Sequence, residues 1–325
     1  MNNETDSDNI CYFYPGMKDL VILLAFALLP GLTGETRAQE PNLSYRLRPG
    51  ERYYLKSDLQ QSTHSESIDS EEISFYSLTG IEFHVDSMDR SGNFFLRGHY
   101  QDLLISMLAP HLDIDINSAS GKDRMLSEMV NLLEQGSFQL VMTPRGELLS
   151  ITGLDGLFAP LEAYPASDTT EQEVILKSLE ETYGADALRS LFNLFVWVYP
   201  VLNPMTNWTN DVTYYFNTKS VSMVNRYLLS RTTEASVGIQ GIGMLNSTKD
   251  FFETTGLGDV KSSVTGSQTF DFQMNPENGW LKRCVSRQRV IIETTILKSS
   301  SLPPGLKIPS YTETVFEVSG GRLNP

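Results

Sequence analysis

One short stretch of the sequence combines an imidazole with two carboxylates at alternate positions. His111, Asp113 and Asp115 are separated by Leu112 and Ile114. In a β-strand alternate side chains share a face, so the three polar groups could together hold a divalent cation. An acidic edge strand with one apolar face requires the same alternation, and this second interpretation is favoured. The sequence therefore assigns no metal site, and His111, Asp113 and Asp115 are its candidates if one exists.

Two further histidines lie on either side of a predicted hairpin turn. His84 and His99 flank the turn at 89–93 and occupy nearly opposed positions. A cross-strand histidine pair could ligate a metal, but the local sequence offers no third ligand. Two polar residues on paired strands are the favoured interpretation.

Motifs for nucleophilic catalysis and for cofactor binding are absent from the sequence. It contains no Gly-x-Ser-x-Gly elbow and no cysteine with a neighbouring histidine. Residues 238–243 have glycines at useful intervals, but they follow a strand pattern and lead into Met244, not into a helix, as a dinucleotide site requires. We therefore predict no catalytic residue and no cofactor, and binding is favoured over catalysis.

The start of the chain has the features of an export signal. An uninterrupted apolar run covers residues 20–29, and small residues precede the expected cleavage between Ala38 and Gln39. At about 1.5 Å per residue the run reaches only about half of the hydrocarbon core, which disfavours a permanent membrane span. We expect a periplasmic or extracellular protein with no transmembrane span in the mature chain.

The composition limits the classes of partner. The chain has 325 residues, with 25 Lys and Arg against 40 Asp and Glu, and a formal charge of −15. Such a surface repels phosphate backbones and anionic headgroups, and no basic patch offsets it, so nucleic-acid and membrane-surface roles are disfavoured. Removal of the signal would leave Cys284 without a partner, and we expect this cysteine to be buried and inert.

Most of the remaining sequence alternates apolar and polar residues between Gly, Asn, Asp and Pro turns. This pattern is typical of half-buried antiparallel strands joined by hairpins. Strands are predicted at 45–59, 73–88, 94–107, 138–142, 147–151, 212–215, 222–230, 235–241, 269–274, 280–296 and 311–318.

Helical periodicity appears in two places, at 124–134 and at 171–199. The second begins with an N-cap pattern at Asp168 and has Gly184 as a point where it can divide in two. Its last part is apolar nearly all round, so we expect the sheet to cover it.

Two predicted hairpins match in register. Phe138, Leu140, Met142 and Pro144 recur as Phe270, Phe272, Met274 and Pro276, and Leu148 corresponds to Leu281 after a one-residue insertion. The match suggests two halves that end in the same hairpin. Two unrelated amphipathic hairpins with Pro and Gly in their turns would look similar, so the duplication is a working hypothesis.

Residues 136–155, which contain the first of these hairpins, resemble the hairpin signature of a family of secreted bacterial proteins of unknown function. Residues 43–53, 203–208 and 265–280 are similar to other parts of that family. The resemblance implies an exported β-rich domain and supplies no activity, substrate or catalytic residue.

These observations predict a β-rich α+β fold, with curved antiparallel sheets in two repeated halves and a long central helix, similar to half-barrel lipoprotein carriers. The expected parts are a non-mature extension and signal peptide (1–38), a first β-rich half (39–152), a helical connector (153–203) and a second β-rich half (204–325).

The predicted function is that of an exported, non-enzymatic protein that binds a lipid or another apolar ligand, or an envelope partner. The abundance of Phe, Tyr and Met on strand faces supports the apolar ligand, although a plain core uses the same residues. Two alternatives remain: a metal-dependent hydrolase centred on His111, Asp113 and Asp115, and a structural or interaction module of the cell envelope.

Overall fold

Strands dominate the protein. A computed structural model describes residues 44–66, 72–109, 112–117, 124–162, 176–177, 179–180, 182–196, 207–216, 219–255 and 258–323. Ala38, Gln39 and His111 lie outside these ranges. Among the helices of the described part, none is long and apolar enough to cross a membrane.

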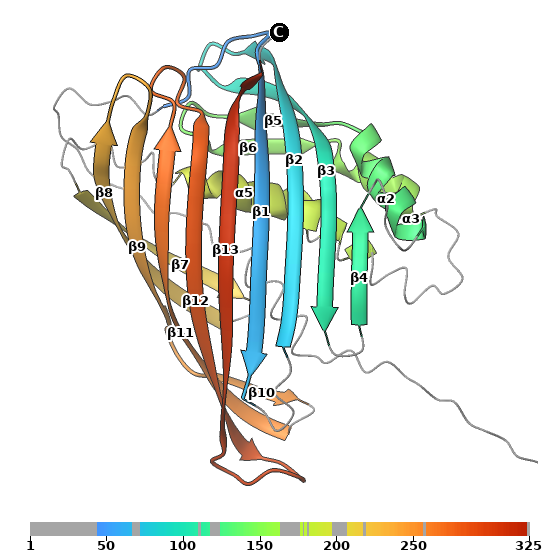
Figure 1. The fold of residues 1–325 in the computed structure, drawn as a ribbon, viewed down its shortest axis with the longest axis vertical. Coiled ribbons are helices and arrows are strands. Elements are labelled where there is room, and N and C mark those ends of the chain that lie inside the picture. Colours follow the sequence, from blue (N-terminus) through green and yellow to red (C-terminus); the bar gives the residue numbers. More distant parts are fainter. Residues whose placement is uncertain are drawn as a thin grey trace, which may run out of the picture.

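One curved sheet of thirteen antiparallel strands forms the body of the molecule (Figure 1). Its order is β6-β5-β3-β2-β1-β13-β12-β11-β9-β8-β7, with β4 paired to β3 and β10 to β11. The first and last strands are therefore neighbours at the centre of the sheet. The strands are β1 (Arg52–Ser65), β2 (Glu72–Met88), β3 (Phe94–Ala109), β4 (Leu112–Asn117), β5 (Phe138–Met142), β6 (Leu148–Thr152), β7 (Asn207–Phe216), β8 (Lys219–Thr232), β9 (Val237–Ser247), β10 (Phe251–Thr255), β11 (Gly258–Met274), β12 (Leu281–Lys298) and β13 (Lys307–Leu323).

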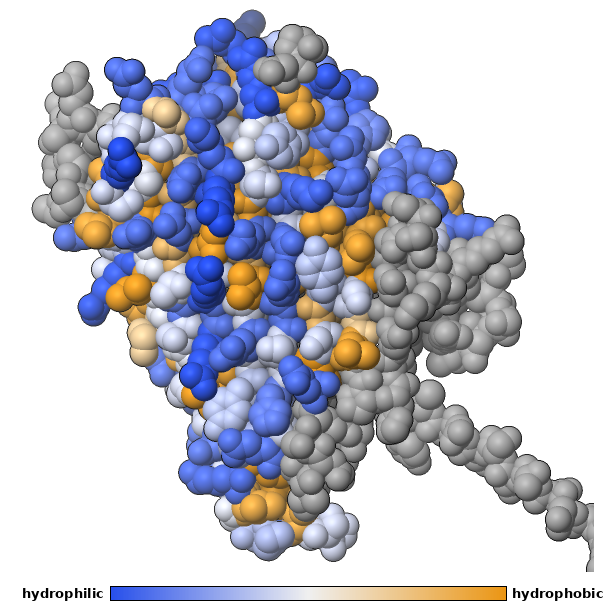
Figure 2. All heavy atoms as spheres, viewed as in Figure 1, coloured by the Kyte–Doolittle hydropathy of each residue, from blue (hydrophilic) through white to orange (hydrophobic). Residues whose placement is uncertain are grey.

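The two faces of the sheet differ in polarity because side chains alternate along each strand. One face, which we call the inner face, contacts the helical residues: the Phe83 ring lies 5.6 Å from that of Phe192, and the Tyr100 hydroxyl donates to the carbonyl of Tyr183. The opposite, outer face is largely hydrophilic with scattered apolar side chains (Figure 2). On β9, for example, Ile239 is buried on the inner face while Ile242 is exposed on the outer face.

Three helices accompany the sheet: α2 (Arg124–Gln135), α3 (Leu154–Glu162) and α5 (Ala185–Val196). The helix predicted at 124–134 is confirmed as α2. The long helix predicted over 171–199 is not observed as one element, because the chain bends at Gly184 and α5 begins after it. A Cβ at Gly184 would lie 2.3 Å from the Glu180 carbonyl oxygen, so the backbone crowds together at this bend.

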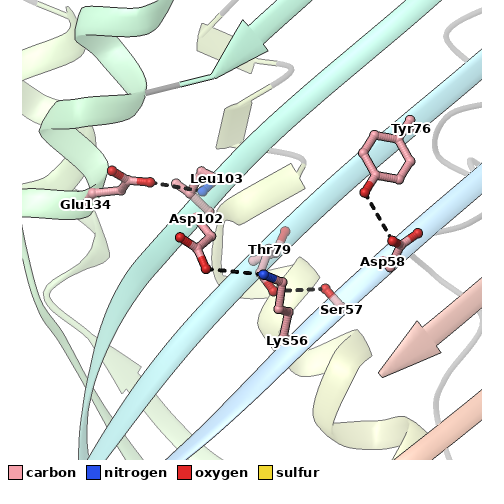
Figure 3. Close-up of polar contacts among 8 residues, drawn as sticks. All are labelled: Lys56, Ser57, Asp58, Tyr76, Thr79, Asp102, Leu103 and Glu134. Atoms are coloured by element: carbon pink, nitrogen blue, oxygen red, sulfur yellow. Dashed lines mark hydrogen bonds and ion pairs between the residues drawn. The ribbon is translucent and has the colours of Figure 1, made fainter. Parts of the chain in front are cut away.

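Helix α2 is fixed to an irregularity in β3 (Figure 3). Asp102 has a φ of 52°, and the next backbone amide, that of Leu103, turns to the helix and donates to the Glu134 carboxylate at 2.9 Å. On the outer face Lys56 reaches Asp102 across β2 at 3.3 Å. Figure 3 also shows two contacts that link β1 to β2, from Ser57 to the Thr79 carbonyl and from Tyr76 to Asp58.

The same strand order occurs twice in the sheet. Reading from one edge, β6-β5-β3-β2-β1 is followed by β13 and then by β12-β11-β9-β8-β7. The register also agrees: Leu96 pairs with Val85 and Leu140, and Ile239 pairs with Leu229 and Phe272.

Two pairs of register shifts fall at matching places as well, whereas the shifts at Leu78/Gly80 and at Asp259/Val260 have no counterpart. The β2–β3 ladder shifts register between Val85 and Ser87, and the β8–β9 ladder shifts between Leu229 and Arg231. The β5–β6 ladder shifts at Met142, the last residue of β5, and the β11–β12 ladder shifts at Met274, the last residue of β11. The inner-face burial predicted for both hairpins is confirmed for Phe138, Leu140, Met142, Phe270, Phe272 and Met274.

Candidate functional site

The backbone places only part of the predicted metal-site candidates. Asp113 and Asp115 lie on β4, opposite Leu108 and Ser106 of β3. Their side chains and the whole of His111 are outside the described part, so the triplet stays a prediction. Among the residues that are described, no group of three or more His, Cys, Asp or Glu is placed to hold a metal ion.

The two hairpin histidines are not opposed. His84 pairs with Arg97, and His99 pairs with Glu82, which lies two residues from His84 on β2. Each imidazole has its own partner: His84 Nδ1 lies 2.6 Å from Asp86, and His99 Nδ1 lies 2.8 Å from the Gly136 carbonyl oxygen. The predicted cross-strand alignment was wrong because the register shift at Asp86 moves the count by one residue.

The inner face carries a polar line that crosses seven neighbouring strands. Its members pair with one another in register, and all but the half-buried Gln288 are buried. We call this line the amide row, since most of its side chains are carboxamides. In order from β7 to β1 it consists of Asn210, Asn225, Gly243, Gln268, Gln288, Thr314 and Gln61.

Three carboxamides of the row form a directional chain of hydrogen bonds. Gln288 Nε2 donates to Gln268 Oε1 at 3.2 Å, and Gln268 Nε2 donates to Asn225 Oδ1 at 2.9 Å. Gln268 Nε2 also contacts the sulfur of Met223. Because each amide donates to the next one, the chain ends at Asn225 with its NH₂ group still to be paired.

The bond from Gln268 to Asn225 exists because Gly243 of β9 lies between these two residues in the sheet. A Cβ on Gly243 would lie 2.3 Å from Asn225 Oδ1 and 2.9 Å from Gln268 Nε2. Any side chain at this position would therefore separate the two amides. The glycines at 238–243, which fail as a phosphate loop, belong to an ordinary strand whose lack of side chains brings its neighbours into contact.

Three buried hydrogen-bond donors on β7 and β8 have no partner. They are Trp208 Nε1, Asn225 Nδ2 and Tyr227 Oη, and we call them the donor trio. The Trp208 and Tyr227 rings are stacked with centroids 5.5 Å apart, and Asn225 lies two residues from Tyr227 on the same face of β8. Each unpaired buried donor costs about 1–3 kcal/mol. Thr314 Oγ1, further along the row, is also buried and unpaired.

Apolar side chains lie on both sides of the donor trio. Phe270 of β11 packs beside Tyr227, with ring centroids 6.0 Å apart. On the other side of the row Val212, Met223 and Leu245 are buried on adjacent strands. Burial raises the pKa of Tyr227 above its usual range, which keeps the phenol protonated and able to donate.

The first run of strands has apolar side chains at the positions equivalent to two members of the donor trio. By pairing, Ile81 corresponds to Asn225, and Phe83, which lacks a hydroxyl, corresponds to Tyr227. Leu55 likewise corresponds to Asn210. The third member, Trp208, corresponds to Tyr53, whose hydroxyl donates to Glu51. The same strand arrangement is therefore built without polar groups at the positions of Asn225 and Tyr227.

The sequence analysis missed this site, although a signal exists. In β8 the inward residues Val221, Met223, Tyr227 and Leu229 are apolar and Asn225 interrupts them; in β11 Gln268 interrupts a similar series. In the pattern of one strand, a polar residue at an inward position appears only as an interruption of the alternation. The pattern does not show that the interruptions of neighbouring strands lie in the same row.

The outer face has one shallow depression of about 450 Å³ in the described region, lined by charged and polar groups. Arg289 lies over the Tyr311 ring at 5.8 Å and contacts Glu313 at 3.7 Å, so its charge is already balanced. His64 lies here on β1.

A family model, described as a family of unknown function (DUF6263), matches residues 91–281, more than half of the chain. The match includes the first hairpin and the donor trio. No curated protein sequence matches the chain.

Solved structures show only distant likeness. Lipovitellin, in a structure titled for its lipid–protein interactions, aligns with a TM-score of 0.46 and 11% identity over 86% of this chain; the aligned part spans 26% of the lipovitellin chain. The Pseudomonas aeruginosa outer membrane protein OprG aligns with a TM-score of 0.20 and 6% identity, over 85% of this chain and 98% of its own. OpdQ from the same species gives 0.20 and 7%, over 86% and 100%. None of these scores supports an argument about function.

Proposed function

We propose that this chain, which belongs to the DUF6263 family of unknown function, is an exported, non-enzymatic protein that binds an apolar ligand on the inner face of its sheet. The ligand lies along β7, β8, β9 and β11. Its apolar part contacts the side chains that flank the amide row, and its polar part meets the donor trio.

The observation that carries the proposal is the set of buried donors without partners. Native interiors pair nearly all of their buried polar groups, so three unpaired donors on two adjacent strands favour a partner from outside the chain. Trp208 contrasts with Trp280, whose indole N–H is also buried but donates to the Tyr54 carbonyl at 3.0 Å. The protein can satisfy an indole, and it leaves that of Trp208 unpaired.

The same comparison supports the finer interpretation of the fold. We propose that β1–β6 and β7–β12 are two copies of one unit, joined at β13 into a half-barrel wall. Matching strand order, register and bulges support this, together with the glycines Gly98 and Gly241, which each lie opposite the first phenylalanine of a hairpin. At Leu55, Ile81 and Phe83 one copy kept apolar side chains, and at the corresponding Asn210, Asn225 and Tyr227 the other acquired polar groups for binding. Export through the N-terminal signal belongs to the same proposal.

The proposal is tested by loading and locating a ligand. The mature protein is delipidated, incubated with a total lipid extract and examined by native mass spectrometry, and we expect discrete bound species. A photoactivatable alkyl diazirine then labels the complex, and we expect the labels at inward residues such as Met223 and Leu245. The outward Ile242 and Met244 of the same strands, both 58% exposed, are the internal controls.

Two results would contradict the proposal. Protein that retains no species after reloading does not bind an extractable apolar ligand. Labels confined to Ile242 and Met244 would show that the outer face, not the inner face, receives the alkyl chain.

A further inference from the structure

We infer that the polar part of the ligand is an uncharged acceptor, an ester or amide carbonyl, that is held by the donor trio. This inference rests on the proposed binding function and specifies which class of apolar ligand the site prefers: an acyl ester or acyl amide over a free fatty acid or a plain hydrocarbon.

The chemistry of the trio fixes the direction of the hydrogen bonds. An indole N–H and a carboxamide NH₂ donate and do not accept. Asn225 cannot turn its oxygen to the ligand without losing the bond from Gln268. Tyr227 retains its proton because burial raises its pKa. Two members of the trio can only donate, and the protonated phenol of Tyr227 can donate as well, so a ligand that satisfies all three supplies acceptor oxygens.

The charge around the site selects a neutral acceptor. Among the inward residues between 208 and 212 of β7, 221 and 229 of β8, 237 and 247 of β9, and 264 and 274 of β11, none is Lys, Arg or His. A buried carboxylate or phosphate without a cation is strongly disfavoured. The nearby Cys284 experiences a negative field, since burial and then Asp271 and Glu317 raise its pKa. An anionic head group would meet both the desolvation cost and this field.

The amide chain strengthens the site for such an acceptor. Gln288 and Gln268 donate in series toward Asn225, and each bond polarises the next one, which makes the terminal NH₂ a better donor. A hydrocarbon would fill the apolar surface but leave all three donors unpaired. An ester carbonyl has two lone pairs and can accept from two of the donors at once.

The test compares three probes with the same chain: methyl palmitate, palmitate and hexadecane, delivered from cyclodextrin to the delipidated mature protein. Dissociation constants come from competition with a fluorescent apolar dye. We expect the ester to bind roughly five- to thirtyfold more tightly than the hydrocarbon, as one or two hydrogen bonds of ordinary strength predict. We expect palmitate at neutral pH to bind more weakly than the ester.

Two variants assign the preference to the trio. Tyr227→Phe and Asn225→Leu remove one donor each, and both should lower the ratio of ester to hydrocarbon affinity toward one. Ile242→Ser, on the outer face of the neighbouring strand, should leave the ratio as in the wild type. Because the readout is a ratio between two ligands of one protein, a general loss of stability does not imitate it.

The outcomes separate this inference from the proposed function. Equal affinity for ester and hydrocarbon, or tighter binding of palmitate than of the ester, overturns the neutral-acceptor inference and leaves apolar binding intact. A ratio that neither variant changes also overturns it. Failure of all three probes to bind would instead count against the proposed function.

Discussion

At the scale of single residues, Tyr100 and Tyr227 are both buried, but only one of the two hydroxyls has a hydrogen-bond partner. The Tyr100 hydroxyl donates to the Tyr183 carbonyl, while the Tyr227 hydroxyl has no partner. Both side chains are at most 2% exposed, so burial is the same and only the hydrogen bond differs. Under the proposed function, the Tyr227 hydroxyl lacks a partner within the protein because it donates to the ligand.

We predict that Tyr227→Phe raises the unfolding free energy of the delipidated protein by up to about 1 kcal/mol, because an unpaired buried hydroxyl is removed. Tyr100→Phe should lower it by about 1 kcal/mol, because a hydrogen bond is lost and the Tyr183 carbonyl is left unpaired. Urea denaturation measures both. Equal destabilisation by the two changes would show that Tyr227 has a partner within the protein.

At this scale the sequence predicts burial better than it predicts partners. The inward Phe and Met residues of both hairpins follow from alternation alone, and Cys284 is buried as expected. Asn225 and Gln268 meet only because Gly243 lies between them across two ladders. Such contacts depend on register between strands that are far apart in sequence, and no local pattern encodes it.

At the scale of elements, the two equivalent hairpin turns are held by different chemistry. In the β2–β3 turn the Asp89 carboxylate accepts from the Ser91 amide at 2.8 Å and from the Asn93 amide at 2.9 Å. In the β8–β9 turn the Thr233 hydroxyl accepts from the Ser236 amide at 3.0 Å. Only the first turn depends on an ionised group.

This difference predicts a pH dependence. The backbone amide of Asn93, more than the other donors around it, holds the pKa of Asp89 below its usual range. A carboxylate with a lowered pKa stabilises the fold above its unfolded-state pKa of about 4, and this contribution is lost as the pH falls through the folded-state value. Asp89→Asn should therefore lower the melting temperature at pH 7, and the gap from the wild type should close in acid.

The matched control is Glu234→Gln in the second turn, where the capping group is a neutral hydroxyl. It should show no comparable change in the gap with pH in the same thermal melts. A gap for Asp89→Asn that is constant from pH 7 to about pH 2 would refute the role of the charge.

Elements were predictable where alternation is strong and unpredictable where it is weak. Residues 138–142 and 73–88 match β5 and β2 closely. Strand β11 begins at Gly258, but the sequence predicted it only at 269–274. The first part of the strand was missed because Ser, Thr, Gly and Lys interrupt the alternation of apolar residues there. The helix predicted over 171–199 is not one element, and it is interrupted at Gly184, the point that the sequence analysis named, because the backbone bends there.

At the scale of the whole molecule, we expect the β7–β9 side to contribute less to stability than the β1–β3 side. Leu55, Ile81 and Phe83 are buried and apolar, while their counterparts Asn210, Asn225 and Tyr227 are polar. A binding surface that is incomplete without its ligand is expected to lower stability in this way. Under the proposed function, the same strand order serves as core on one side and as a binding surface on the other.

The most direct test of this account replaces the polar groups by their counterparts in one variant, Asn210→Leu/Asn225→Ile/Tyr227→Phe. Urea denaturation gives the unfolding free energy of the delipidated wild type and variant, each with and without saturating methyl palmitate. We predict that the variant is the more stable protein without ligand. We also predict that the ester stabilises the wild type by about 2–3 kcal/mol at a hundredfold excess over its dissociation constant, and the variant by much less. A variant that is less stable than the wild type, together with an equal or absent ester effect in the two proteins, would contradict the account.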